Sequence, residues 1–191
     1  VEIMESIYNK EIKGLYVMGE NPAMSDPNAN HAREALARLD MLIVQDIFLT
    51  ETAYLADIVL PASAFPEKTG TFTNTDRRVQ LAKKAINPPG DAKQDLWIIQ
   101  ELAKRMGLDW NYSGPDEVYD ELSGCMESMK NITWERLVNE GAVTYPCDDS
   151  SKPGNEVIFG EGFPTDNKKA RIVPAKIVSP DETPDSSFPL I

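Results

Sequence analysis

The side chains best suited to binding a ligand lie where apolar runs of the chain end. Four of them occupy the ends of the first two runs: Gly19, Asn21, Gln45 and Asp46. Glycine lets a phosphate approach the backbone, an asparagine amide both donates and accepts, and an acid after a second strand commonly accepts hydrogen bonds from a ribose diol. These residue types suit a nucleotide, but the segment lacks the GxGxxG pattern that would indicate a dinucleotide by itself.

Each candidate also has a purely structural interpretation, and spacing does not choose between the two. Asn21 suits a turn or a helix N-cap, and Asp46 suits the start of a helix. Lys68 either contacts a phosphate or pairs with the neighbouring Glu67 in solvent. Asp95 either begins a helix, where the dipole favours an acid, or accepts the two donors on the Watson–Crick edge of guanine, which adenine does not present.

The counts of histidine and cysteine limit the metal and nucleophilic chemistry of the chain. His31 is the only histidine, which excludes a metal site built from several histidines. The two cysteines, Cys125 and Cys147, lie 22 positions apart, so the chain cannot itself supply four thiolates to a cluster. We therefore expect no metal ligand among its residues.

Charge and hydropathy exclude two classes of partner. With 31 acidic and 19 basic residues, the chain has a net charge of −12, which repels the phosphates of DNA and RNA. No apolar run approaches the ~18 residues of a membrane span, and the first residues lack the pattern of a signal peptide. We therefore expect neither nucleic-acid binding nor membrane contact, and the cysteine usage favours a reducing compartment.

The apolar runs predict the strands that position the candidate residues. They are short and continuously apolar, as in strands buried on both faces of a parallel sheet, over residues 14–18, 41–44 and 58–60. Apolar residues at helical spacing predict a helix over 32–39, and Thr50 can cap a short helix that runs through residue 56. This order predicts an α/β fold with an open, mainly parallel, Rossmann-like sheet and flanking helices.

The remainder of the chain is less regular. Residues 61–76 lack periodicity and predict a long loop. Beyond it we expect a strand over 77–82, helices over 94–106, 116–122 and 134–140, and short strands over 157–159 and 170–173. Breakers dominate after residue 146, so we expect a Rossmann-like domain over 1–146 and an irregular C-terminal extension over 147–191.

Several longer motifs resemble one protein family. The segments GLYVMGENPAMSDPNANHAREALARLDMLIVQD, from residue 14, and EKTGTFTNTDRRVQ, from residue 67, resemble the large subunit of oxidoreductases that carry molybdopterin guanine dinucleotide. The segments AKQDLWIIQELAKRMG and WERLVNEGAVTYPC resemble the formate dehydrogenase catalytic (alpha) subunit in particular. The resemblance covers almost the whole chain and is weakest over residues 148–180.

The resemblance implies a fold, a cofactor and its contacts. In this family the region is the Rossmann-like third domain of the large subunit, which helps to hold one guanine dinucleotide arm of a bis-pterin cofactor carrying molybdenum or tungsten. Five positions match family cofactor contacts: Asn21, Gln45, Asp46, Lys68 and Asp95. Gly19 lies in the same turn as the first of them. We expect Asp46 to contact the ribose and Asp95 the guanine edge, and these two roles are exchangeable.

The resemblance also places the redox centre outside these residues. In the family, the iron–sulfur cluster, the cysteine or selenocysteine ligand of molybdenum and the second pterin-binding portion belong to other parts of the large subunit. We therefore expect an excised domain with no catalytic residue, no cofactor when isolated and no formate dehydrogenase activity alone. Its expected partners are the other domains of the catalytic subunit and the electron-transfer subunits of a cytoplasmic complex.

Two alternatives stay open at this point. Relatives include nitrate reductases, and the large subunit of respiratory complex I keeps the fold without the cofactor, so the fold alone does not establish binding. The match at WERLVNEGAVTYPC favours formate over nitrate. The intact contact residues favour a cofactor-binding domain over a scaffold.

Overall fold

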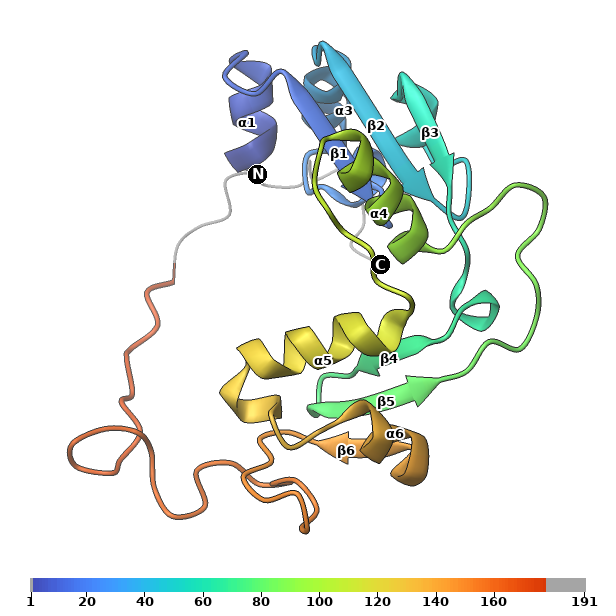
Figure 1. Cartoon of the computed structure of the whole chain (residues 1–191). Helices are drawn as coiled ribbons and strands as arrows, with labels where there is room; N and C mark the ends of the chain where they lie inside the picture. The colour runs from blue at the N-terminus through green and yellow to red at the C-terminus, as the bar shows by residue number, and fades with distance from the viewer. Residues whose placement is uncertain (1, 178–191) are drawn as a thin grey trace. The chain divides into compact units, whose positions relative to one another are not determined.

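The computed structural model describes residues 2–177, which form two compact units that divide after Asn155. The first unit contains every helix and strand of the described residues (Figure 1). The part of the predicted C-terminal extension over residues 178–191 lies outside the described residues.

A three-stranded parallel sheet forms the N-terminal part of the first unit. Its strands are β1 (Gly14–Met18), β2 (Met41–Asp46) and β3 (Ile58–Pro61), and β2 lies between the other two. Helix α1 (Glu2–Tyr8) precedes β1, and the connection from β1 to β2 contains α2 (Pro22–Ser25) and α3 (Ala29–Leu36). The predicted α/β fold with a parallel sheet is confirmed, and β2 extends two residues farther than predicted.

The connection from β2 to β3 is less helical than predicted. In place of a helix over 50–56 there is a single 3₁₀ turn, Ala53–Leu55. The Thr50 hydroxyl accepts a hydrogen bond from the Ala53 N–H (3.2 Å), as a cap would. The turn ends early because the Asp57 N–H donates to Leu42 O (2.9 Å) and so aligns the chain with β2.

The two faces of the parallel sheet differ in burial. On one face Leu42 and Val44 pack with α1 and α3 in the core of this region. On the other face Tyr16 is 38% exposed and Ile58 43% exposed. The prediction that the strands are buried on both faces is therefore wrong: α4 (Asp95–Arg105) and the segment after it, with Leu108 and Trp110, lie over this second face and leave these side chains partly exposed (Figure 1).

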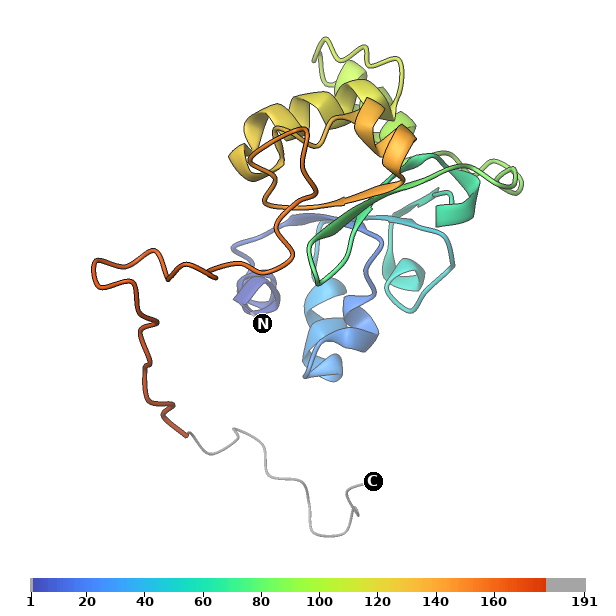
Figure 2. The same cartoon turned by 90° about the horizontal axis from the view of Figure 1, so that it is seen from below.

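An antiparallel sheet, absent from the sequence-based prediction, follows along the chain. Strand β5 (Arg78–Ala82) lies between β4 (Gly70–Thr73) and β6 (Ala142–Thr144). Helices α5 (Pro115–Cys125) and α6 (Trp134–Glu140) lie on one side of these strands, as Figure 2 shows, around the buried Val79 and Leu137. A 3₁₀ turn, Glu127–Met129, connects the two helices.

The prediction of a continuous loop over 61–76 is wrong as a result. The segment contains a 3₁₀ turn (Phe65–Glu67) and β4. Strand β4, GTFT, has no apolar alternation of its own, and it becomes regular because it pairs with β5.

The described part of the second unit, residues 156–177, has no helix or strand. The short strands predicted over 157–159 and 170–173 are therefore wrong. Their apolar residues Val157 and Ile172 are exposed, and no neighbouring strand of the described residues pairs with them. The irregular character of this extension agrees with the prediction. No helix of residues 2–177 has the length and apolarity needed to cross a bilayer.

Candidate functional site

Three of the six predicted binding residues meet at the carboxyl end of the parallel sheet. Gln45, near the end of β2, is fully buried and donates a hydrogen bond from Nε2 to Asp95 Oδ1 (2.6 Å). Lys68 Nζ contacts the other carboxylate oxygen of Asp95. Asp95 is the first residue of α4, where the helix dipole favours a negative charge. An amide, a carboxylate and an ammonium group thus converge from three segments of the chain.

Tyr16, which the sequence analysis missed, extends this group. Its hydroxyl donates to Oε1 of Gln45. Burial and the negative charge of Asp95 raise the pKa of Tyr16 above its ordinary value. Strand periodicity could have found it: Tyr16 pairs with Ile43 and so shares a face with Gln45, two residues on. We call Tyr16, Gln45, Lys68 and Asp95 the strand-end cluster.

Asn21 connects the loop after β1 to the loop after β2. Its Oδ1 accepts hydrogen bonds from the N–H (3.1 Å) and the hydroxyl (2.7 Å) of the fully buried Thr52. Its Nδ2 donates to Glu51 Oε2 (2.7 Å), and this bond lowers the pKa of Glu51. Helix α2 begins directly after Asn21 without a side-chain cap. Asn21 therefore has the turn-stabilising role that the sequence allowed, and it makes no hydrogen bond to the strand-end cluster among the described residues.

Asp46 and Gly19 shape the ends of their strands. Asp46 Oδ1 accepts a hydrogen bond from the Ile47 N–H (2.6 Å), which fixes the turn after β2. Gly19 has a φ of +64°, where a side chain is strained, and its N–H donates to Gln45 O (2.9 Å). No atom lies within 4 Å of the position a Cβ would take at Gly19, so a ligand can approach the backbone there.

A buried hydroxyl lies just beyond β3. Ser63 is almost fully buried, and its Oγ has no hydrogen-bond partner among the described residues. Its N–H donates to Lys93 O (2.9 Å), and the N–H of the preceding Ala62 donates to Asp46 O (3.0 Å), so it lies next to a predicted binding residue. Because an unpaired buried hydroxyl costs free energy, Ser63 points to a polar group that these residues do not supply.

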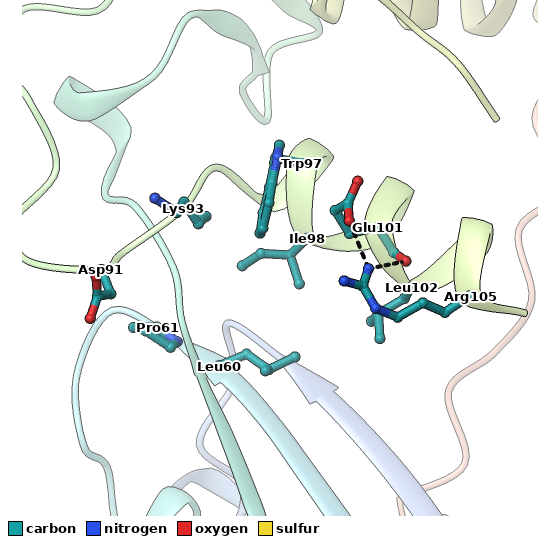
Figure 3. A pocket seen from close by; sticks show the side chains of 9 residues that line it. All are labelled: Leu60, Pro61, Asp91, Lys93, Trp97, Ile98, Glu101, Leu102 and Arg105. Carbon is teal, nitrogen blue, oxygen red and sulfur yellow. Dashed lines mark hydrogen bonds and ion pairs between the residues drawn. The ribbon is translucent and has the colours of Figure 1, made fainter.

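A cavity of about 370 Å³ lies between the end of β3 and α4. Figure 3 shows Trp97 of α4 across the cavity from Leu60 and Pro61, with Arg105 bonded to Glu101 at one end. None of the six predicted binding residues lines this cavity. It is therefore a feature separate from the strand-end cluster.

The strand-end cluster is chemically suited to a ligand that presents donors beside an acceptor. An ionised carboxylate offers about four lone-pair directions, and Gln45 and Lys68 each use one on Asp95. The others can accept two parallel N–H donors, while Lys68 has further N–H groups to donate. Within residues 2–177 no group of His, Cys, Asp and Glu is arranged to hold a metal ion.

Comparison with known proteins gives a consistent family assignment. The family model described as molybdopterin oxidoreductase matches residues 1–105. The F420-dependent formate dehydrogenase subunit alpha of Methanocaldococcus jannaschii is 46% identical over 184 residues, which are 95% of this chain and 27% of that protein. A putative formate dehydrogenase of Bacillus subtilis is 39% identical over 185 residues, 97% of this chain and 19% of that protein. The chain thus spans about a quarter or less of the length of these relatives.

A solved structure shares the fold. Acetylene hydratase from Pelobacter acetylenicus superposes with a TM-score of 0.60 at 25% sequence identity, covering 75% of this chain and 20% of that protein.

Proposed function

Because the chain belongs to the molybdopterin oxidoreductase family, we propose that it is a cofactor-binding domain of the catalytic subunit of a molybdenum-dependent formate dehydrogenase. Formate as the substrate is supported by relatives named as formate dehydrogenases, which align with almost the whole chain at 39–46% identity. In the complete enzyme, formate loses two electrons and one proton to give carbon dioxide. The residues of this chain contribute by binding and orienting the nucleotide part of the cofactor.

The observation that carries the proposal is the contact of Asp95 with both Gln45 and Lys68. Guanine presents the N1–H and N2–H donors beside the acceptor O6, whereas adenine has an amino donor in place of O6. The Asp95 carboxylate matches the two donors, and Lys68 Nζ, which contacts that carboxylate, matches O6. The strand-end cluster is therefore complementary to guanine and mismatched to adenine.

This arrangement favours contact of Lys68 with guanine O6 over contact with a phosphate. An ammonium group in contact with Asp95 lies beside the base edge that Asp95 reads. A phosphate at the same place would lie against the Asp95 carboxylate, and like charges repel. We therefore assign Lys68 to the base. Gly19, where the backbone is open to a ligand, remains for the phosphates, and Asp46 for the ribose.

The rest of the enzyme is part of the same proposal. Molybdenum, held by two pterins with guanine dinucleotide arms, supplies the two-electron redox chemistry when bound, and an iron–sulfur cluster elsewhere in the subunit carries electrons onward. Electron-transfer subunits in the cytoplasm are the proposed partners. The 191-residue chain alone, assayed with formate and an artificial electron acceptor, is expected to show no turnover.

Nucleotide binding to the chain tests the proposal, because added GDP supplies the guanine base, the ribose and the phosphates of the cofactor arm that the isolated chain is expected to lack. In titration calorimetry we expect GDP to bind at least about tenfold more tightly than ADP, because a good paired contact to a base discriminates by roughly 1–3 kcal/mol. Asp95→Asn should weaken GDP binding because its amide group would meet a guanine donor. Asp116→Asn is the matched control: Asp116 also lies in the first turn of a helix, α5, but outside the cluster. Absence of GDP binding by the unaltered chain would favour a scaffold and refute the proposal.

Lys68→Met separates the two ligand roles of Lys68. If Lys68 contacts O6, guanosine and GDP lose affinity by the same factor. A loss confined to GDP would instead assign Lys68 to a phosphate and contradict the base-reading role.

A further inference from the structure

Building on the proposed function, we propose that Tyr16 is a positioning residue: its hydroxyl fixes the orientation of the Gln45 amide, and through it the Asp95 carboxylate that reads the base. In this assignment Tyr16 does not touch the ligand. It acts through two hydrogen bonds in series, from its hydroxyl to Gln45 and from Gln45 to Asp95.

The direction of these hydrogen bonds follows from the chemistry of the groups. An ionised carboxylate can only accept, so Gln45 must turn its NH₂ group toward Asp95. The amide oxygen then faces Tyr16, whose hydroxyl is the donor that satisfies it. An ordinary tyrosine hydroxyl is protonated at neutral pH, and partial burial and the charge of Asp95 raise the pKa of Tyr16 further. Each of the two hydrogen bonds, from Tyr16 to Gln45 and from Gln45 to Asp95, therefore has one direction.

The Tyr16 side chain lies beside α4 and the segment that follows this helix. Together with Leu102 of α4, and with Met106 and Trp110 after that helix, it lines an apolar groove of about 240 Å³. The same helix begins with Asp95. Helix α4 thus carries the ligand-reading carboxylate at its first residue and part of the wall around the Tyr16 ring in its later turns.

Without the hydroxyl, the fully buried Gln45 would keep an amide oxygen that has lost its donor. A rotation of the amide by half a turn would then bring that oxygen against the Asp95 carboxylate, where two acceptors repel. This rotation would move the carboxylate from its orientation, although every proposed ligand-contacting group would still be present.

The test compares Tyr16→Phe, Gln45→Met and the double variant in GDP titrations of the full 191-residue chain. We expect Tyr16→Phe to weaken GDP binding about tenfold, the loss typical of one hydrogen bond to a buried polar group. If Tyr16 acts through Gln45, the double variant should bind no more weakly than Gln45→Met alone. Tyr112→Phe is the matched control, because it removes a tyrosine hydroxyl bonded to Glu121 (2.6 Å) outside the cluster.

A second measurement does not depend on the ligand. In the chain labelled with ¹⁵N-glutamine, the buried side-chain NH₂ of Gln45 should exchange slowly with solvent, and Tyr16→Phe should speed this exchange. Additive losses in the double variant, or unchanged exchange at Gln45, would overturn the role of Tyr16. If the unaltered chain fails to bind GDP, the proposed function fails, whereas the exchange result still decides whether Tyr16 orients Gln45.

Discussion

Asn21→Ala should be among the more destabilising single substitutions in the chain, because it removes the connection between two loops. The change leaves the N–H and the hydroxyl of Thr52 without their acceptor, and Thr52 has no exposed surface. A buried donor without a partner costs about 1–3 kcal/mol, and the hydroxyl can rotate toward another acceptor. We therefore expect the free energy of unfolding to fall by roughly 2–4 kcal/mol.

Urea unfolding followed by circular dichroism and tryptophan fluorescence measures this loss. Asn28→Ala is the matched control: the Asn28 side chain accepts one hydrogen bond, from the His31 N–H at the start of α3 (3.2 Å). Losing a helix cap costs about 1 kcal/mol. If Asn21→Ala is no more destabilising than Asn28→Ala, the connection through Thr52 does not stabilise the fold, and the reasoning is refuted.

Asn21→Asp adds a pH dependence with a definite sign. The new carboxylate keeps the acceptor for Thr52 but faces Glu51, whose pKa the Asn21 amide holds below its ordinary value in the unaltered chain. In the unaltered chain this bond stabilises the fold above the unfolded-state pKa of Glu51, and the contribution is lost as the pH falls through the lowered value. In Asn21→Asp the two carboxylates repel when both are ionised. The variant should therefore be closest to the unaltered chain in acid and farthest from it at neutral pH.

Other contacts of the first unit lead to three more expectations. Burial raises the pKa of Tyr119 to about 12, and its hydroxyl has no partner among the described residues. Tyr119→Phe should therefore keep or raise the melting temperature at pH 7, and a lower melting temperature would contradict this. The unaltered chain should lose stability between about pH 10 and 12, where only the unfolded phenol ionises, and Tyr119→Phe should lose less over that range. Arg136 donates to the Cys147 sulfur (3.1 Å), and a guanidinium beside a sulfur favours the thiolate, which is the reactive form, so Arg136→Met should slow the reaction of Cys147 with a thiol reagent relative to the exposed Cys125; an unchanged ratio of rates would count against it. Gly19→Ala should cost about 1–2 kcal/mol of stability from its positive φ alone, and an unchanged melting temperature would show that the strain is absent.

The parallel sheet could be predicted because its signal is local. Each strand is a short apolar run that a turn residue ends, and the helix before β2 shows its period within eight residues. In the antiparallel sheet only β5 has such a signal, and the strand predicted over 77–82 is confirmed there. Strand β6 is three residues long and pairs with β5 from far along the chain, Arg78 opposite Thr144. Only pairing makes β4 and β6 strands, and a pattern confined to one segment does not carry that information.

Part of the candidate site could be predicted for a similar reason. The end of β2 and the start of α4 are local features, and they place Gln45 and Asp95 at the carboxyl end of the sheet. Pairing of Lys68 with Glu67 was one interpretation of the sequence, but the Glu67 carboxylate is buried and accepts the Ala64 N–H (2.8 Å). Lys68 contacts Asp95 instead. Proximity in the sequence did not predict the partner of Lys68, because the 3₁₀ turn at Phe65–Glu67 directs the Glu67 and Lys68 side chains to different partners.

The free edge of β3 has a consequence for the behaviour of the chain at high concentration. Within residues 2–177, β2 is the only strand that pairs with β3. Lys93 covers just the end of the outer edge, where its N–H donates to Pro61 O (3.1 Å), and Ile58 and Val59 are exposed. An unpaired strand edge with apolar side chains is a template for pairing with a second molecule, a step toward aggregation. The net charge of −12 opposes this by mutual repulsion, which salt screens over about 10 Å at 0.1 M. Light scattering in a salt series should therefore show self-association that grows with ionic strength. Colloidal stability of this chain thus depends on its acidic surface more than on its fold.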